Sequence, residues 1–249
     1  MNLIPMFLMN SMRRLFISIL GILLLGMIAY WPVQTRVGVD YEWSERSIHF
    51  YEKATNFFSR HFQTRHLVSN LLEEIDYPEE QLQLLFAWSR DHVQSTPPGL
   101  PVVDDHVWHI LVRGYGATDQ RTEAFALLAS YAGFPATVTV MRIPGTANGL
   151  IVALVKIDQL VHVFDVERGL VFLDEYGQLI DAARLATAPE VVRSITNGIE
   201  IAGRPYEHYV PSLLNLDLTF NRMELQKPWP RLKHETLQFV NRIFEVTGR

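Results

Sequence analysis

The chain has 249 residues, of which 48% are apolar and 20% charged, with a net charge of −5 and no cysteine. This length and composition indicate one membrane segment plus one compact domain, and they argue against two full domains or a disordered chain. The lack of cysteine excludes disulfides, thiolate metal sites and thiol catalysis. Residues 32–249 carry 20 basic against 27 acidic side chains, which argues against a nucleic acid partner.

The first predicted element is an uncharged apolar run of 17 residues at 15–31, which follows two arginines and ends in a Tyr-Trp pair. Its length suits a membrane span, and aromatic residues are common at the membrane interface. A cleaved signal peptide is the alternative, although no small-residue cleavage site follows the run. We predict an uncleaved anchor with residues 1–14 in the cytoplasm and the domain in the periplasm or outside the cell. Met1 and Met12 both remain possible starts.

The segment after the anchor is predicted to be a linker at 32–43 and then a helical lobe. Apolar residues recur there at intervals of three and four, which is the spacing of a helix with one buried face. The predicted helices cover residues 44–62, 64–75, 79–93 and 102–113.

Residues 114–135, GYGATDQRTEAFALLASYAGFP, form the most strongly specified segment of the chain. Thr118 is of a type that caps a helix N-terminus and Asp119 suits its first turn, whereas the Gly133-Phe-Pro135 run ends a helix. We therefore predict a buried helix from Thr118 to Ala132.

Beyond this helix the apolar period changes from 3.6 to 2, which predicts strands. Turn residues separate them, so that antiparallel hairpins are expected. The predicted strands cover residues 137–141, 150–157, 160–166, 170–173 and 178–180. Helices followed by an antiparallel sheet give an α+β fold.

The last part of the chain, residues 181–249, is predicted to pack on this core as a C-terminal extension, because no linker composition separates it. A helix with a break at Pro189 is expected over 182–195, a strand within 213–225, and a closing amphipathic helix over 231–246.

The helix segment and the strands together resemble the transglutaminase-like superfamily, which is related to papain-like thiol enzymes. Members read G-x-C-D-Q at the start of a helix that ends in GIPA, and this chain reads GATDQ and AGFPA. The run VFD followed by GLVF resembles the family's FDP and G-x-Y-F. The resemblance covers residues 81–180 and implies a core, within residues 44–180, of a helical lobe packed on an antiparallel sheet.

The resemblance also implies a degenerate Cys-His-Asp triad. Thr118 stands at the position of the cysteine, Asp165 matches the aspartate, and Leu150 matches the histidine best, with Asn148 as the alternative. A threonine without an adjacent base has no route to activation. His162 is three residues from Asp165 on one strand, so we predict a half-exposed side chain that points away from it.

Two further groups of residues were considered as sites. Asp104, Asp105, His106 and His109 could form half of a metal site, but no further ligand with a recognisable spacing follows. We therefore expect no metal and no cofactor. Aromatic residues near the family's substrate cleft are expected to be core residues, except for one in the glycine turn; they are Trp88, Trp108, Tyr131 and Tyr115.

The sequence therefore predicts a membrane-anchored pseudoenzyme whose domain binds a peptide, a glycan or an envelope protein. Tyr115, Thr118 and Asp119 are the predicted ligand-binding residues, and no residue is expected to be catalytic. An active hydrolase or acyltransferase that uses Thr118 or a relocated base is the alternative. A structural subunit with an unused cleft is the third possibility.

Overall fold

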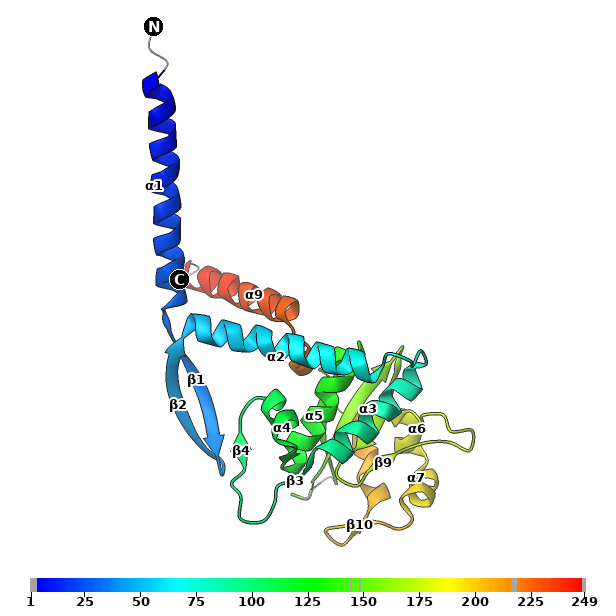
Figure 1. Ribbon diagram of the computed structural model, residues 1–249. Helices are drawn as coiled ribbons and strands as arrows, with labels where there is room; N and C mark the ends of the chain where they lie inside the picture. Colours follow the sequence, from blue (N-terminus) through cyan, green and yellow to red (C-terminus); the bar gives the residue numbers. More distant parts are fainter. Residues whose placement is uncertain (1–3, 144, 148, 216–218, 248–249) are drawn as a thin grey trace.

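The computed structural model describes residues 4–143, 145–147, 149–215 and 219–247. Its first element, α1 (Ile4–Ala29), is a long helix that stands away from the rest of the chain (Figure 1). The segment Met12–Ala29 is long and apolar enough to cross a membrane, and none of it is buried within the protein. The helix ends at Ala29 instead of the predicted Trp31, because a residue before proline, here Pro32, avoids helical geometry.

A β-hairpin follows α1 where a linker was predicted over 32–43. Strand β1 (Pro32–Val39) pairs with β2 (Glu42–His49) in antiparallel register. The linker prediction was wrong because the turn was missed. Asp40 and Tyr41 both take positive φ values, 50° and 69°, which allow a tight two-residue connection.

The helical lobe was predicted with one helix too many. A single helix, α2 (Phe50–Leu71), replaces the two predicted at 44–62 and 64–75, and residues 44–49 belong to β2. The helix predicted at 102–113 is shorter, because two of its residues pair with β1 as strand β4. The remaining elements of the lobe are α3 (Pro78–His92), β3 (Gln94–Ser95), β4 (Val103–Asp104), α4 (Val107–Arg113), β5 (Tyr115–Gly116) and α5 (Thr118–Tyr131).

The strands predicted after α5 are confirmed as a four-stranded antiparallel sheet in the order β6-β7-β8-β9. A further bridge between Leu173 and Leu179 corresponds to the second predicted hairpin. The strands are β6 (Ala136–Arg142), β7 (Gly149–Ile157), β8 (Leu160–Asp165) and β9 (Leu170–Val171). The protein is therefore a mixed α/β structure with helices before the sheet.

Each face of the sheet carries its own hydrophobic core. On one face, Ala153 and Val155 of β7 belong to the cluster that surrounds α5. On the other face, Leu150, Val152 and Leu154 of the same strand belong to a cluster with the C-terminal segments. Successive strand residues point to opposite faces, so one strand supplies both layers.

The C-terminal layer is built from short elements. The helix predicted over 182–195 is confirmed, and its break at Pro189 separates α6 from α7. The strand predicted within 213–225 is wrong for the described residues, which form short helices. The elements are α6 (Ala182–Thr187), α7 (Pro189–Thr196), β10 (Glu200–Ile201), β11 (Arg204–Pro205), η1 (Tyr206–His208), η2 (Val210–Asn215), α8 (Asn221–Glu224) and α9 (Pro228–Thr247).

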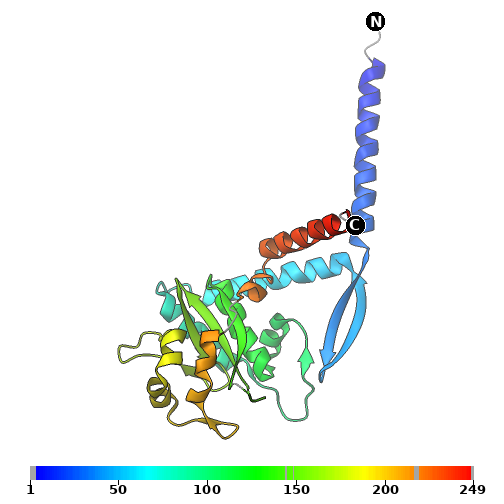
Figure 2. The ribbon, with the colours of Figure 1, turned by 180° about the vertical axis from the view of Figure 1, so that it is seen from behind.

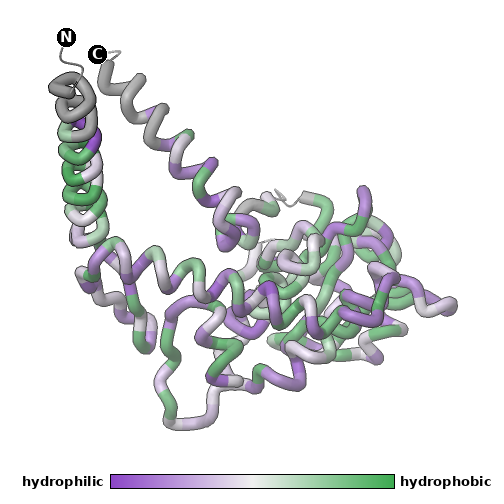
Figure 3. The backbone as a smooth tube through the Cα atoms, turned by 45° about the horizontal axis from the view of Figure 1, so that its top comes forward, coloured by the Kyte–Doolittle hydropathy of each residue, from purple (hydrophilic) through white to green (hydrophobic). Residues whose placement is uncertain are grey.

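The last helix, α9, confirms the predicted helix over 231–246 but not its packing on the core. Figures 2 and 3 show α9 leaving the domain as a separate arm. Trp229 is 79% exposed, Leu232 56% and Leu237 53%. The expectation that residues 181–249 pack on the core therefore applies to the segments up to α8 and not to this arm.

Candidate functional site

The candidate site is the N-terminus of α5, where the glycine turn meets the most deeply buried helix. Gly114 ends α4 with a φ of 74°, a left-handed conformation that favours glycine. The parallel pairing of β3 with β5 then fixes the chain before the helix. Ten of the residues in α5 are buried, so the helix itself is held rigidly against the sheet.

Thr118 does not cap this helix as predicted. Ala117 takes the extended N-cap position, and Thr118 is the first helical residue. The side chain of Gln120 supplies the missing cap, because its Oε1 accepts from the Ala117 N–H at 3.1 Å. A backbone amide is thus satisfied by a residue within the first turn. This frees the Thr118 hydroxyl for another partner.

That partner is Glu167, in the turn after β8. The Thr118 hydroxyl donates to Glu167 Oε2 at 3.1 Å, and Arg121 Nη1 donates to the same oxygen at 2.7 Å. The Arg121 side chain is only 8% exposed and the Glu167 side chain 31%. Charge-assisted hydrogen bonds of this kind are short and strong. The hydroxyl therefore lies against an ion pair.

Arg121 is itself held by two more acceptors. Its Nε donates to the Val93 carbonyl at 3.0 Å, and its Nη1 donates to the Ser95 hydroxyl at 3.1 Å. The arginine thus joins α5, the end of α3 and the turn after β8. Sequence reasoning missed both Arg121 and Glu167. An arginine in a helix predicted to be buried was the available signal, since a buried charge requires a partner.

A second polar network fixes the other side of the turn. Arg113 Nε donates to the Tyr115 carbonyl at 2.9 Å, and its guanidinium lies 5.5 Å from the centre of the Tyr115 ring. Arg113 Nη2 also donates to Gln120 Oε1 at 3.1 Å. Tyr115 is half-buried, whereas Asp119 is exposed. The three predicted ligand-binding residues, Tyr115, Thr118 and Asp119, thus lie within one short turn at the surface.

Asp165 lies elsewhere. It is fully buried, and it accepts from the Arg168 N–H at 3.0 Å, Arg168 Nη1 at 3.1 Å and the Tyr206 hydroxyl at 3.2 Å. Burial raises the pKa of this carboxyl, and the Arg168 charge opposes that shift. Because Tyr206 belongs to the C-terminal layer, Asp165 faces away from α5.

Leu150 also faces the C-terminal layer, where it is 2% exposed. The expected triad positions Thr118, Leu150 and Asp165 are therefore not brought together. A histidine at position 150 would not reach residue 118. The alternative position, Asn148, lies outside the described residues.

His162 is buried and not half-exposed as predicted. It is 4% exposed, and its Nδ1–H donates to the Ile180 carbonyl at 3.2 Å. Burial lowers the pKa of the imidazole, and the hydrogen bond to Ile180 opposes the shift. Within the described residues, no hydrogen bond joins a histidine to Thr118.

The residues considered for a metal site have other roles. His106 accepts from the Trp108 N–H at 3.1 Å through Nδ1, and its Nε2–H donates to Gln226 Oε1 at 2.8 Å. His109 contacts Asp105 at 3.2 Å. Among the residues whose placement is described, no three metal-ligating side chains converge.

The aromatic residues expected in the core are confirmed there. Trp88, Trp108 and Tyr131 pack against the cluster around α5. Tyr131 also donates its hydroxyl to the Gln226 carbonyl at 3.1 Å, and burial raises its pKa to about 12. These three rings therefore support the lobe.

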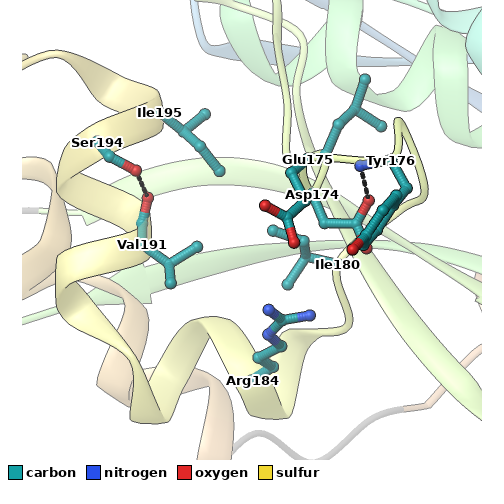
Figure 4. Close-up of a pocket in the computed structure, with 9 residues that line it drawn as sticks. Asp174, Glu175, Tyr176, Ile180, Arg184, Val191, Ser194 and Ile195 are labelled. Carbon is teal, nitrogen blue, oxygen red and sulfur yellow. Dashed lines mark hydrogen bonds between the residues drawn. The ribbon is translucent and has the colours of Figure 1, made fainter.

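A cavity of about 450 Å³ lies away from this turn, between the 174–177 turn and helices α6 and α7 (Figure 4). Ile180, Val191 and Ile195 form its apolar wall, and Asp174, Glu175 and Arg184 add charged groups to its lining. None of its lining residues belongs to the network around Thr118. It is an open concavity in the C-terminal layer and not a cleft at the end of α5.

The comparisons with known proteins assign no family. The chain matches no protein-family model, and no curated protein matches it. Among solved structures, it is similar to a “putative protease” from Parabacteroides distasonis ATCC 8503, with 12% identity and a TM-score of 0.35. The match covers 43% of this chain and 25% of that one. The chain thus spans about a quarter of the length of that protein.

Proposed function

We propose that this chain is a membrane-anchored domain of transglutaminase-like architecture, located outside the cytoplasm, that binds a peptide, a glycan or an envelope protein without catalysis. The observation that carries the proposal is the position and the hydrogen bonding of the Thr118 hydroxyl. Its hydroxyl lies at the N-terminus of the buried helix, where the resembled enzymes hold a cysteine, and it donates to a carboxylate that Arg121 already binds.

The architecture supports the same interpretation. A central helix with ten buried residues packs on an antiparallel sheet, and a helical lobe precedes it. The two other triad positions carry no catalytic pair, because Leu150 is apolar and Asp165 is bound to Arg168 and Tyr206 on the opposite face. A nucleophile without a base and an orienting group lacks the unit that acts in thiol enzymes.

The proposed binding surface is the turn that carries Tyr115, Thr118 and Asp119. Tyr115 presents a half-buried ring held from behind by Arg113, and exposed Asp119 adds a negative charge. A rigid ring beside hydrogen-bonding groups suits a peptide or sugar ligand.

The test compares two photo-crosslinking variants of the full chain in its native membranes. Replacing Tyr115 by a photoreactive phenylalanine analogue should give discrete adducts with one envelope component. The matched control replaces Tyr176, which is 79% exposed in the C-terminal layer, and should give none. Equal labelling from both positions would contradict the proposed surface.

An enzyme is the second candidate, and the Thr118–Glu167 hydrogen bond is the observation in its favour. A carboxylate beside a hydroxyl can act as a base, although Glu167 is engaged by Arg121. Hydrolysis of amide or ester substrates by the purified full chain, abolished equally by Thr118→Ala and Glu167→Gln, would replace the binding proposal with the enzyme. We expect background turnover in all three proteins.

The membrane orientation has its own test. Basic residues before a span remain in the cytoplasm, so a reporter fused after Arg249 should be active only outside the cytoplasm. Cytoplasmic reporter activity, or release of a shortened soluble chain, would contradict the proposed anchor.

A further inference from the structure

We propose that α9 is a second membrane contact, which lies flat in the lipid headgroup region and fixes how the domain faces the bilayer. The inference rests on the proposed anchor and goes beyond it. It commits to a lipid surface as the occupant of the apolar face of α9.

The residues of α9 follow the pattern of an amphipathic helix. On a helical wheel, Trp229, Leu232 and Thr236 share one face, and Arg231, His234 and Gln238 share the opposite face. A helix with one apolar and one polar side, an aromatic residue at its edge and moderate overall hydrophobicity is typical of an interfacial helix.

Apolar side chains of α9 are also exposed. Trp229 and Leu232 are more than half exposed, although the residues just before α9 are tightly fixed to the domain. Lys227 Nζ donates to the Ser130 carbonyl at 2.8 Å, and Ser130 donates to Glu224 Oε1 at 2.9 Å. The start of α9 is thus fixed to the domain, while its apolar face remains exposed and able to contact lipid.

The position of α9 relative to α1 supports the same inference. Figures 1 and 2 share a vertical axis, and in both views α9 lies level with the lower end of α1 and runs across the direction of that helix. If Met12–Ala29 crosses the bilayer, its end at Ala29 marks the membrane surface. A helix lying across that level is placed where an interfacial helix buries its apolar side.

The natural lack of cysteine makes the test direct. Leu232→Cys and Gln238→Cys form a matched pair on opposite faces of α9, both at exposed positions, so neither should disturb folding. Each full-length variant is labelled with an environment-sensitive fluorophore and reconstituted into phosphatidylcholine vesicles that contain lipids with a spin label near the headgroup. We expect the label at Leu232→Cys to be quenched at least about twofold more than the label at Gln238→Cys.

Two controls separate this inference from the anchor. A label at Ile22→Cys, within α1, should be quenched by lipids that carry the spin label deep in the acyl chain, and a label at Tyr176→Cys should not be quenched. Quenching at Ile22→Cys with equal, weak quenching on both faces of α9 would overturn the inference and leave the anchor intact. Loss of quenching at Ile22→Cys would overturn the anchor.

The other occupants of the apolar face also have a defined outcome. Phe58 and Phe62 of α2 are 47% and 59% exposed, and α9 could fold against them or against a second copy of the chain. A blue-shifted label at Leu232→Cys that lipid quenchers do not reach would identify a protein partner and overturn the lipid contact.

Discussion

The layer around α5 and the region that we propose to lie near the membrane, formed by α1, the β1–β2 hairpin, α2 as far as Phe62 and α9, are built in opposite ways. We call the second one the membrane-proximal region. In the α5 layer, Phe125 and Leu128 are completely buried, and even the charged Arg121 is enclosed by partners. In the membrane-proximal region, large apolar side chains such as Phe62 and Leu232 are mostly exposed.

The buried layer around α5 therefore stabilises the fold, whereas the membrane-proximal region presents apolar surface to its surroundings. The α5 layer removes apolar surface from water and supplies the stability of the domain. The membrane-proximal region gains little from its apolar residues while they are exposed to water, and exposed apolar surface of this kind is typical of interaction sites. The four predictions below test this separation, from the largest effect to the smallest.

The largest effect is expected at Phe125, whose ring lies 5.4 Å from that of Phe86 and 4.9 Å from that of Phe164. Phe125→Ala should lower the free energy of unfolding by about 3–5 kcal/mol, because it leaves a cavity in a rigid core. Phe62→Ala, at an exposed position of α2, should change it by less than about 0.5 kcal/mol. Urea unfolding of the full chain in mild detergent measures both, and similar losses would break the comparison.

The side chain of His106, which donates to Gln226 shortly before α9, should make the stability sensitive to pH. Burial lowers the pKa of His106 from 6.5 to about 4. The folded state thus binds fewer protons than the unfolded state between these values. The stability is fully present above pH 6.5 and is lost as the pH falls towards 4. We expect a loss of about 1–3 kcal/mol over this interval, measured by unfolding at a series of pH values.

Protonation would also turn the acceptor at Nδ1 into a donor that faces the Trp108 N–H. His106→Asn should remove much of the pH dependence, since asparagine can also cap α4. His109→Asn, at a more exposed histidine on the same helix, is the matched control and should leave the pH dependence unchanged. A wild-type profile that is flat between pH 7 and 4.5 would refute the prediction.

A smaller effect is expected at Thr118. Thr118→Ser retains the donor to Glu167 and should be nearly silent, whereas Thr118→Ala removes it and should cost about 1–2 kcal/mol. Thermal melts of both variants measure the difference. If Thr118→Ala melts like the wild type but loses binding at the Tyr115 turn, the hydroxyl acts on the ligand and not on stability.

The smallest effect is expected in α9. Leu232→Gln should change the free energy of unfolding by less than about 0.5 kcal/mol in detergent-free amphipol, because the side chain is 56% exposed. A loss of more than 1 kcal/mol would show that α9 contributes to the folded core. In that case α9 would belong to the core of the domain and not to the membrane-proximal region.

The comparison also explains which predictions from the sequence succeeded. Helix α5, strands β6 to β9 and the break at Pro189 were predicted because local signals agreed there with the apolar period. The hairpin at β1 and β2 was missed, because its strands have few buried residues and β2 is exposed at almost every position. Its turn uses Asp40 and Tyr41 in place of the usual glycine.

The candidate site was predicted only in part. The sequence placed Tyr115, Thr118 and Asp119 in one turn because they are neighbours in the chain. It did not place Glu167 against Thr118, since the two are 49 positions apart and only the packing of α5 on the sheet brings them together. The cap was also assigned to the wrong residue, because the helix begins at Thr118 and Ala117 takes the N-cap position.

The sequence by itself determined that helices precede the sheet, the apolar span near the N-terminus and the absence of a thiol, because these depend on composition and on periods of a few residues. The tertiary structure decided which face of the sheet each side chain joins. Leu150 and Asp165 match the resembled motif by spacing, yet both point into the C-terminal layer. The physical reason is that strand side chains alternate, so a shift of one residue moves a group to the opposite face, and only the packed sheet shows which face α5 covers.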